Sequence, residues 1–102
     1  MTFFVVMMTH PDGPGWRQHV MPHVEYLNGL IAAGKLRASG PVKGQAQRAG
    51  LLVFSVADRA ELDALIAADP FAFQGLIEEL TVTEWNPLFG AFASEAEPYR
   101  PD

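Results

Sequence analysis

The sequence contains no cysteine and few basic residues. Without cysteine among the 102 residues, disulfides, thiolate catalysis, iron–sulfur clusters and cysteine-ligated zinc are excluded. Seven Lys and Arg residues are dispersed among 12 Asp and Glu, and the formal net charge of −5 argues against nucleic acid, which needs a clustered positive face. No apolar run approaches the roughly 20 residues that span a bilayer, and the N-terminus lacks the pattern of a signal peptide. We therefore expect one cytoplasmic domain that binds neither nucleic acid nor membrane.

The composition is nevertheless that of a folded chain, with 49% hydrophobic and 19% charged residues. The apolar segment 2–9 is bounded by turn formers over 10–15, which is typical of a buried strand. Apolar side chains then recur every three or four positions at Trp16, Val20, Val24, Leu27 and Ile31. This spacing predicts a helix over 16–33, and we expect its regular part to begin near Met21, because Pro22 suits only a first helical turn.

The middle of the chain predicts a hairpin followed by a second helix. Strands at 35–41 and 51–56 are joined by the polar loop 42–50. Asp58 and Glu61 have the spacing of a capping box, which places the start of a helix here. The buried stripe of this helix consists of Leu62, Leu65 and Ile66.

The last part of the chain predicts a strand and an extension. Pro70 ends the second helix, residues 71–75 form a turn or short helix, and the alternation over 77–85 indicates a final strand. The acidic, proline-rich residues 93–102 are expected to be a mobile tail. Three residues are too apolar for a free segment and are expected to cover a dimer edge or groove: Leu88, Phe89 and Phe92.

The predicted order βαββαβ gives an α+β, ferredoxin-like domain over 1–86, with an extension and tail over 87–102. Two helices would pack on one face of a four-stranded antiparallel sheet. The inner strands are apolar on both faces, so the other face predicts a homodimer.

Two residues stand out as candidates for chemistry. His23 lies at the margin of the apolar helix face, where it is either a boundary histidine bonded to backbone or a general acid or base. Asp69 continues an inward stripe at the C-terminal end of a helix, where negative charge is unfavourable by about 0.3–1 kcal/mol. It is either the cap of an Asp-Pro turn or a catalytic carboxylate, and the two roles are compatible.

Other kinds of site find little support. His19 and His23 are one helical turn apart, but no carboxylate supplies an obvious third ligand beside them, so no metal is expected. The only GxG is Gly13-Pro14-Gly15, whose proline removes an amide that would face a phosphate. No serine lies in a nucleophile elbow, which argues against nucleophilic hydrolysis.

A series of short motifs follows in order along residues 2–86. They are the strand 3–8, Arg17, 21–23 (MPH), 26–27 (YL), 33–36 (AGKL), 40–41 (GP), 50–53 (GLLV), 68–71 (ADPF), Gly75 and a strand that ends at Trp85. In this order and spacing the sequence resembles the YCII-related family, small ferredoxin-like proteins of the dimeric α+β barrel group.

The resemblance implies a homodimer with an active site centred on a histidine and an aspartate, here His23 and Asp69. We further expect Arg17 to anchor a substrate carboxylate, and Gly40 and Pro41 to shape the wall of the cleft. The two helices are expected to run parallel, which separates His23 from Asp69. Contact would then need His23 to lie lower on its helix than Pro22 suggests, a returning loop at 70–75, or a site shared between two subunits.

The resemblance also implies a reaction class. Better understood relatives of the family are dehydrochlorinases, and the wider superfamily includes muconolactone isomerase, so we expect a lyase or isomerase that needs no cofactor. Its ligand would be a small, anionic, unsaturated ring acid or lactone, on which a histidine base moves a proton. The alternative is a non-catalytic module that binds a small ligand or dimerises.

Overall fold

The structure is a computed structural model that describes residues 1–99. Its strands are β1 (Thr2–Thr9), β2 (Leu36–Pro41), β3 (Ala49–Val56) and β4 (Glu79–Trp85). Its helices are α1 (Gly15–Ala32), α2 (Arg59–Ala67), the four-residue α3 (Pro70–Phe73) and the short 3₁₀ helix η1 (Ala93–Glu95). Among the described residues, no helix is long and apolar enough to cross a membrane.

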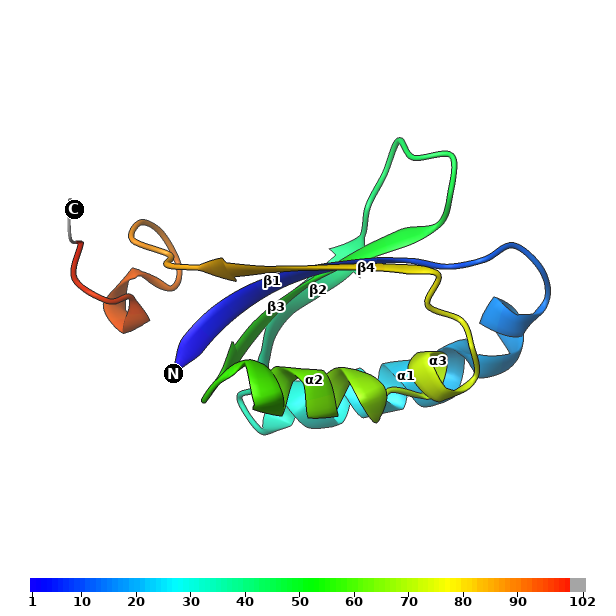
Figure 1. The fold of residues 1–102 in the computed structure, drawn as a ribbon, viewed down its shortest axis with the longest axis horizontal. Coiled ribbons are helices and arrows are strands. Elements are labelled where there is room, and N and C mark those ends of the chain that lie inside the picture. Colours follow the sequence, from blue (N-terminus) through cyan, green and yellow to red (C-terminus); the bar gives the residue numbers. More distant parts are fainter. Residues whose placement is uncertain (100–102) are drawn as a thin grey trace.

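The four strands form one antiparallel sheet in the order β2-β3-β1-β4, and all three α-helices lie on one face of it (Figure 1). This arrangement confirms the predicted α+β, ferredoxin-like fold. The hairpin and both long helices are where the sequence placed them. However, β3 begins two residues earlier than predicted and β4 two residues later, because pairing with β1 rather than local hydrophobicity sets their ends.

The core lies between the sheet and the helices. Alternate residues of β1 (Phe4, Val6 and Met8) face the helices and are at most 4% exposed. Phe4 pairs in register with Phe54 of β3, so the two inner strands present their apolar residues to the same face. Leu62 and Ile66 of α2 close this core, as their spacing predicted.

The helices α1 and α2 run in opposite directions, so the expectation that they run parallel is wrong (Figure 1). Each helix returns along the sheet from the strand before it, and those strands, β1 and β3, are themselves antiparallel. The first half of α1 therefore lies beside the C-terminal end of α2.

Helix α1 is continuous through Pro22, which corrects the predicted start near Met21. Both halves are held by packing, with Trp16 near Phe71 of α3 and Leu30 in the core. These contacts outweigh the one backbone donor that proline lacks. The predicted stop at Gly34 is correct: with φ +75°, its amide bonds the carbonyl of Ile31.

The C-terminal extension contacts the sheet and the residue that follows it as far as Glu97, where the sequence predicted a mobile tail from residue 93. Phe92 packs on Phe3 and Trp85 of the same chain, with ring centroids 5.5 and 6.5 Å away. Asn86 exchanges two hydrogen bonds with the backbone of Glu97, at 2.9 and 3.0 Å. The part of the predicted tail beyond residue 99 lies outside the described residues.

Candidate active site

A pocket of about 540 Å³ opens between α1 and the ends of β1, β2 and β3. Its α1 wall carries the apolar stripe that the sequence predicts for this helix: Trp16, Val20, Val24, Leu27 and Ile31. Val24 and Ile31 are 37% and 51% exposed, so this stripe lines an open pocket instead of filling the core. We call it the α1–sheet pocket.

His23 and Asp69 meet within one chain beside this pocket. Nδ1 of His23 lies 2.8 and 2.9 Å from the two carboxylate oxygens of Asp69. Because α1 and α2 are antiparallel, His23 in the first half of α1 lies next to the residue that follows α2. The contact needs no second subunit.

Asp69 is a turn cap, one of the two roles that the sequence left open for it, and its carboxylate also contacts His23. It is the N-cap of α3, where its Oδ1 accepts a hydrogen bond from the amide of Phe71 at 2.9 Å. Its side chain is 3% exposed, and that of His23 is 13% exposed. A carboxylate this buried needs partners, and the imidazole and the amide supply them.

The bond to Asp69 fixes the tautomer of His23. An ionised carboxylate only accepts hydrogen bonds, so Nδ1 of His23 donates and Nε2 carries the lone pair. The ring is also held flat against Phe71, with centroids 3.9 Å apart and planes 10° apart. His23 lines the pocket, and Nε2 is its nitrogen left available to a ligand.

A second histidine, His10, lines the same pocket and is 5% exposed. It follows β1 directly, and its Nδ1 donates to the carbonyl of Leu76 at 2.7 Å. Burial lowers the pKa of His10, with smaller lowering effects from His23 and Arg48; the bond to Leu76 and the charge of Asp69 act in the opposite direction. His10 is therefore a neutral histidine near pH 7.

The cation of the pocket is Arg48, not Arg17. The guanidinium carbon of Arg48 lies 4.0 Å from the ring centroid of Trp16, so the side chain is stacked on the α1 wall. Arg17, in contrast, is exposed on α1 and is not among the residues that line the pocket. Trp16 and Arg17 are adjacent, and on a helix adjacent side chains point in different directions.

Gly40 and Pro41 line the pocket from the end of β2, at the place expected for them. Pro41 pairs in register with Gly50 of β3, and a Cβ added at Gly50 would lie 3.9 Å from the carbonyl oxygen of Gly40. Gly40 and Gly50 bring no side chain to this part of the wall, so the backbone itself borders the pocket there.

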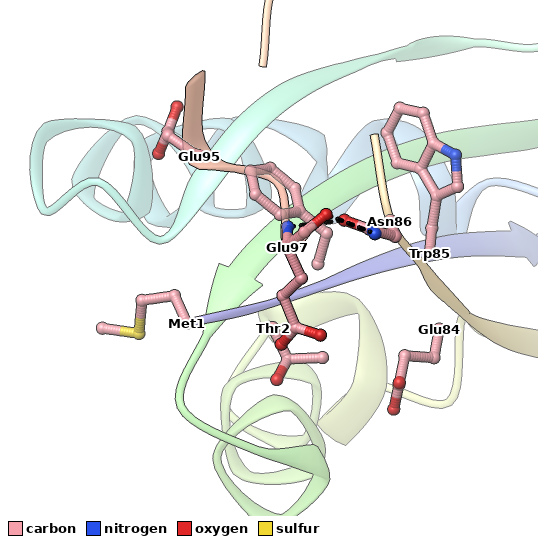
Figure 2. Close-up of a pocket in the computed structure, with 8 residues that line it drawn as sticks. Met1, Thr2, Glu84, Trp85, Asn86, Glu95 and Glu97 are labelled. Carbon is pink, nitrogen blue, oxygen red and sulfur yellow. Dashed lines mark hydrogen bonds between the residues drawn. The ribbon is translucent and has the colours of Figure 1, made fainter. Parts of the chain in front are cut away.

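Within residues 1–99, no group of three or more His, Asp and Glu side chains is arranged to hold a metal ion. A smaller hollow of about 230 Å³ lies at the other end of the sheet, beside the extension (Figure 2). Glu84, Glu95 and Glu97 line it, and Figure 2 shows the carboxylate of Glu95 directed away from those of the other two. The α1–sheet pocket, with its two histidines and one arginine, is the candidate active site.

The sequence singled out His23 and Asp69, which the structure brings together, but it did not single out Arg48, Phe71 or His10, which line the pocket beside them. The available signal for His10 was its place directly after a buried strand, since strand ends commonly carry functional side chains into a pocket. Arg48 lies in a polar loop with no pattern of its own, and nothing local distinguishes it from Lys43.

The fold and this pocket define a small ferredoxin-like protein with a histidine–aspartate site. The family model of the YCII-related domain matches residues 1–86, and the chain belongs to this family. No curated protein matches the sequence significantly.

Solved structures share the fold at low sequence identity. One is 5-chloro-2-hydroxyhydroquinone dehydrochlorinase (TftG) from Burkholderia phenoliruptrix, in complex with 2,5-dihydroxybenzoquinone; it is 22% identical, with a TM-score of 0.71 over 81% of this chain and 92% of that one. An uncharacterized NIPSNAP domain protein from Burkholderia xenovorans is 14% identical, with a TM-score of 0.55 over 85% and 94% of the two chains. Protein Atu4242 from Agrobacterium tumefaciens is 17% identical, with a TM-score of 0.55 over 85% and 93%.

Proposed function

We propose that the protein is a lyase or isomerase that moves a proton on a small, anionic, unsaturated ring acid or lactone, without a cofactor. The observation that carries this proposal is the bond between His23 and the buried Asp69 in the wall of an apolar pocket. A filled interior around His23 would have favoured the non-catalytic alternative. Instead, His23 borders a space large enough for a small ring compound.

His23 is the proposed proton-transfer residue. Its Nε2 would take a proton from a carbon next to a carbonyl or double bond, and the C–H electron pair would move into the conjugated system. In an isomerisation the proton returns to another carbon; in a dehydrochlorination the electron pair expels chloride. The charge on the imidazolium is balanced by Asp69, which also keeps Nδ1 protonated.

Arg48 is the proposed anchor for the negative group of the ligand, in place of Arg17. Its stacking on Trp16 reduces the conformational freedom that binding would otherwise remove. The positive charge of Arg48 in the pocket wall also favours an anionic ligand over a neutral one. Arg48→Met should weaken binding of a ring carboxylate roughly tenfold, whereas Arg17→Met should leave it unchanged.

The structural neighbours are consistent with this reaction class. TftG is a dehydrochlorinase that was solved with a small quinone, and dehydrochlorination is one of the two proton transfers considered above. At 22% identity this likeness shows the fold alone, and the features that support the proposed reaction are His23, Asp69 and Arg48 of this chain.

The test begins with a thermal-shift screen of small aromatic acids, chlorinated hydroquinones and lactones, because a ligand that binds the native state raises its stability. Compounds that bind are then incubated with the protein, and product and chloride release are measured. We expect turnover by the wild type and loss of at least about 100-fold in His23→Ala with the fold intact. Binding without turnover, unaffected by His23→Ala, would instead identify a ligand-binding module.

A further inference from the structure

His10 presents a fixed hydrogen-bond acceptor to the α1–sheet pocket. Its Nδ1 lies 2.7 Å from the carbonyl oxygen of Leu76, and a carbonyl can only accept. Nδ1 therefore carries the hydrogen, and Nε2 carries a lone pair. Two hydrogen bonds to the backbone of His10 hold the residue in place. Its amide donates to the carbonyl of Arg48 at 2.9 Å, and its carbonyl accepts from the side-chain Nε2 of Gln47 at 3.2 Å.

Nε2 of His10 has no hydrogen-bond partner among residues 1–99, yet it is not sealed in the core. Every fully buried side-chain nitrogen or oxygen of the described chain has a partner, so the unpartnered Nε2 lies at the pocket surface. The residue as a whole is 5% exposed. A nearly buried acceptor that faces a pocket is a feature that a ligand donor would satisfy.

The two histidines of the pocket differ in what holds them. Both imidazole rings pack against the ring of Phe71, with centroid distances of 3.9 Å for His23 and 5.0 Å for His10. His23 is held by a carboxylate, which compensates the positive charge when the ring takes a proton. His10 is held by a neutral carbonyl and lies near the positive charge of Arg48, so it is suited to remain neutral and to accept a hydrogen bond.

We propose that Nε2 of His10 accepts a hydrogen bond from a hydroxyl group of the ligand, so that the pocket selects hydroxylated ring acids over their deoxy and methyl ether analogues. This inference rests on the proposed function, because it names the ligand class of the same pocket. In this arrangement Arg48 binds the anionic group, His10 accepts a hydrogen bond from the hydroxyl, and His23 faces the reacting carbon. A site built to bond a hydroxyl discriminates strongly against analogues that lack it, since its acceptor is then left unpaired.

The test measures dissociation constants by titration calorimetry for benzoate, the three hydroxybenzoates and their three methoxy analogues. We expect at least one hydroxybenzoate to bind the wild type roughly 10- to 100-fold more tightly than benzoate and its own methyl ether. The key variant is His10→Asn, whose amide nitrogen can replace the Nδ1 donor to Leu76 while Nε2 is lost. It should bind the hydroxybenzoate and benzoate equally.

Two controls separate recognition from a structural effect. His10→Gln places an acceptor oxygen toward the pocket and should restore part of the preference, while His19→Asn, a histidine outside the pocket, should leave the wild-type ratio unchanged. Long-range ¹H–¹⁵N NMR spectra of His10 should show hydrogen on Nδ1 and a shift of Nε2 when the hydroxybenzoate binds.

The outcomes distinguish this inference from the proposed function. If benzoates bind in the pocket without preference for a hydroxyl, or if His10→Asn keeps the wild-type ratio, the role of His10 is refuted and the proposed function stands. If the methyl ethers bind as tightly as the hydroxybenzoates, His10 is not an acceptor. If no ring carboxylate binds, both the proposed ligand class and the inference fail.

Discussion

At the scale of single residues, one buried carboxylate beside the pocket makes two contacts. Asp69 caps α3 through the amide of Phe71 and holds Nδ1 of His23 through the same carboxyl group. Asparagine can still accept the hydrogen bond from the amide, but it lacks the charge and can present an NH₂ group to the imidazole. A change to asparagine therefore separates the capping contact from the charged contact with His23.

We expect Asp69→Asn to reduce turnover about 100-fold or more, because the tautomer of His23 is no longer fixed. The free energy of unfolding should fall by less than about 1 kcal/mol, since the N-cap is retained. Steady-state kinetics and denaturant unfolding measure the two effects. The matched control is Asp58→Asn, at the N-cap of α2, which should change neither turnover nor stability appreciably. An unfolded Asp69→Asn protein whose native fraction binds ligand normally would show that Asp69 is only a turn cap.

The burial of His10 leads us to expect that the stability of the protein depends on pH. Burial lowers its pKa in the folded protein below that of the unfolded chain, where the ordinary value is 6.5. Below pH 6.5 the unfolded state thus binds more protons at this site, and the stability contribution present at pH 7 is lost as the pH falls through the folded-state pKa. His23, Arg48 and Asp69 surround the ring and contribute to this shift.

We expect the stability difference between wild type and His10→Asn to shrink as the pH falls from 7.5 to 5. Its slope cannot exceed about 1.4 kcal/mol per pH unit, the value for one proton. Urea unfolding at half-unit pH intervals measures it, and the subtraction removes the titration of groups common to both proteins. A difference that stays constant or grows on acidification would contradict a lowered pKa.

At the scale of elements, α3 connects the two histidines. Its N-cap Asp69 holds His23, and the residue after its C-terminal turn, Leu76, holds His10. That turn has the hydrogen bonds of a Schellman motif: the amide of Gly75 donates to the carbonyl of Ala72, and the amide of Leu76 donates to the carbonyl of Phe71. Gly75 has φ +71°, a conformation that other residues adopt only with strain.

Two glycine-to-alanine changes should therefore have opposite signs. Gly75→Ala should destabilise the fold by about 1–2 kcal/mol, because alanine is strained in the left-handed region. Gly29→Ala should stabilise it by about 0.5–1 kcal/mol, since Gly29 lies within α1 and a Cβ there meets no atom within 4 Å among the described residues. Chemical unfolding of both variants gives the values. Equal changes in the free energy of unfolding would mean that backbone conformation does not determine the effect of alanine at either position.

At the scale of the whole molecule, one face of the sheet has no helix over it among residues 1–99 (Figure 1). Apolar side chains point to this face in register: Val5 pairs with Val53, and Met7 pairs with Leu51, which is 41% exposed. Phe92 covers only the end of this face, at Phe3 and Trp85, while Phe89 is 90% exposed. The predicted cover by the extension is thus made partly within the chain.

This uncovered apolar face is the basis for the proposed homodimer. We expect a dimer by light scattering at micromolar concentration. Val53→Glu should shift it to monomer, because a charge would be buried in the interface. Ala64→Glu, on an exposed position of α2, is the control and should leave the dimer intact. A wild-type monomer at this concentration would refute the proposal.

The sequence by itself determined the order of the elements and the two residues most suited to chemistry. Hydrophobic periods, the Asp58–Glu61 cap and the stop at Gly34 are local signals, and local signals define local structure. Tertiary structure decided the direction of α1 relative to α2, the use of the α1 stripe as a pocket wall, and the presence of Arg48 and His10 in that pocket. His23 and Asp69 are 46 positions apart, and His10 and Leu76 are 66 apart. Contacts over such separations depend on strand pairing and helix packing, which no local pattern specifies.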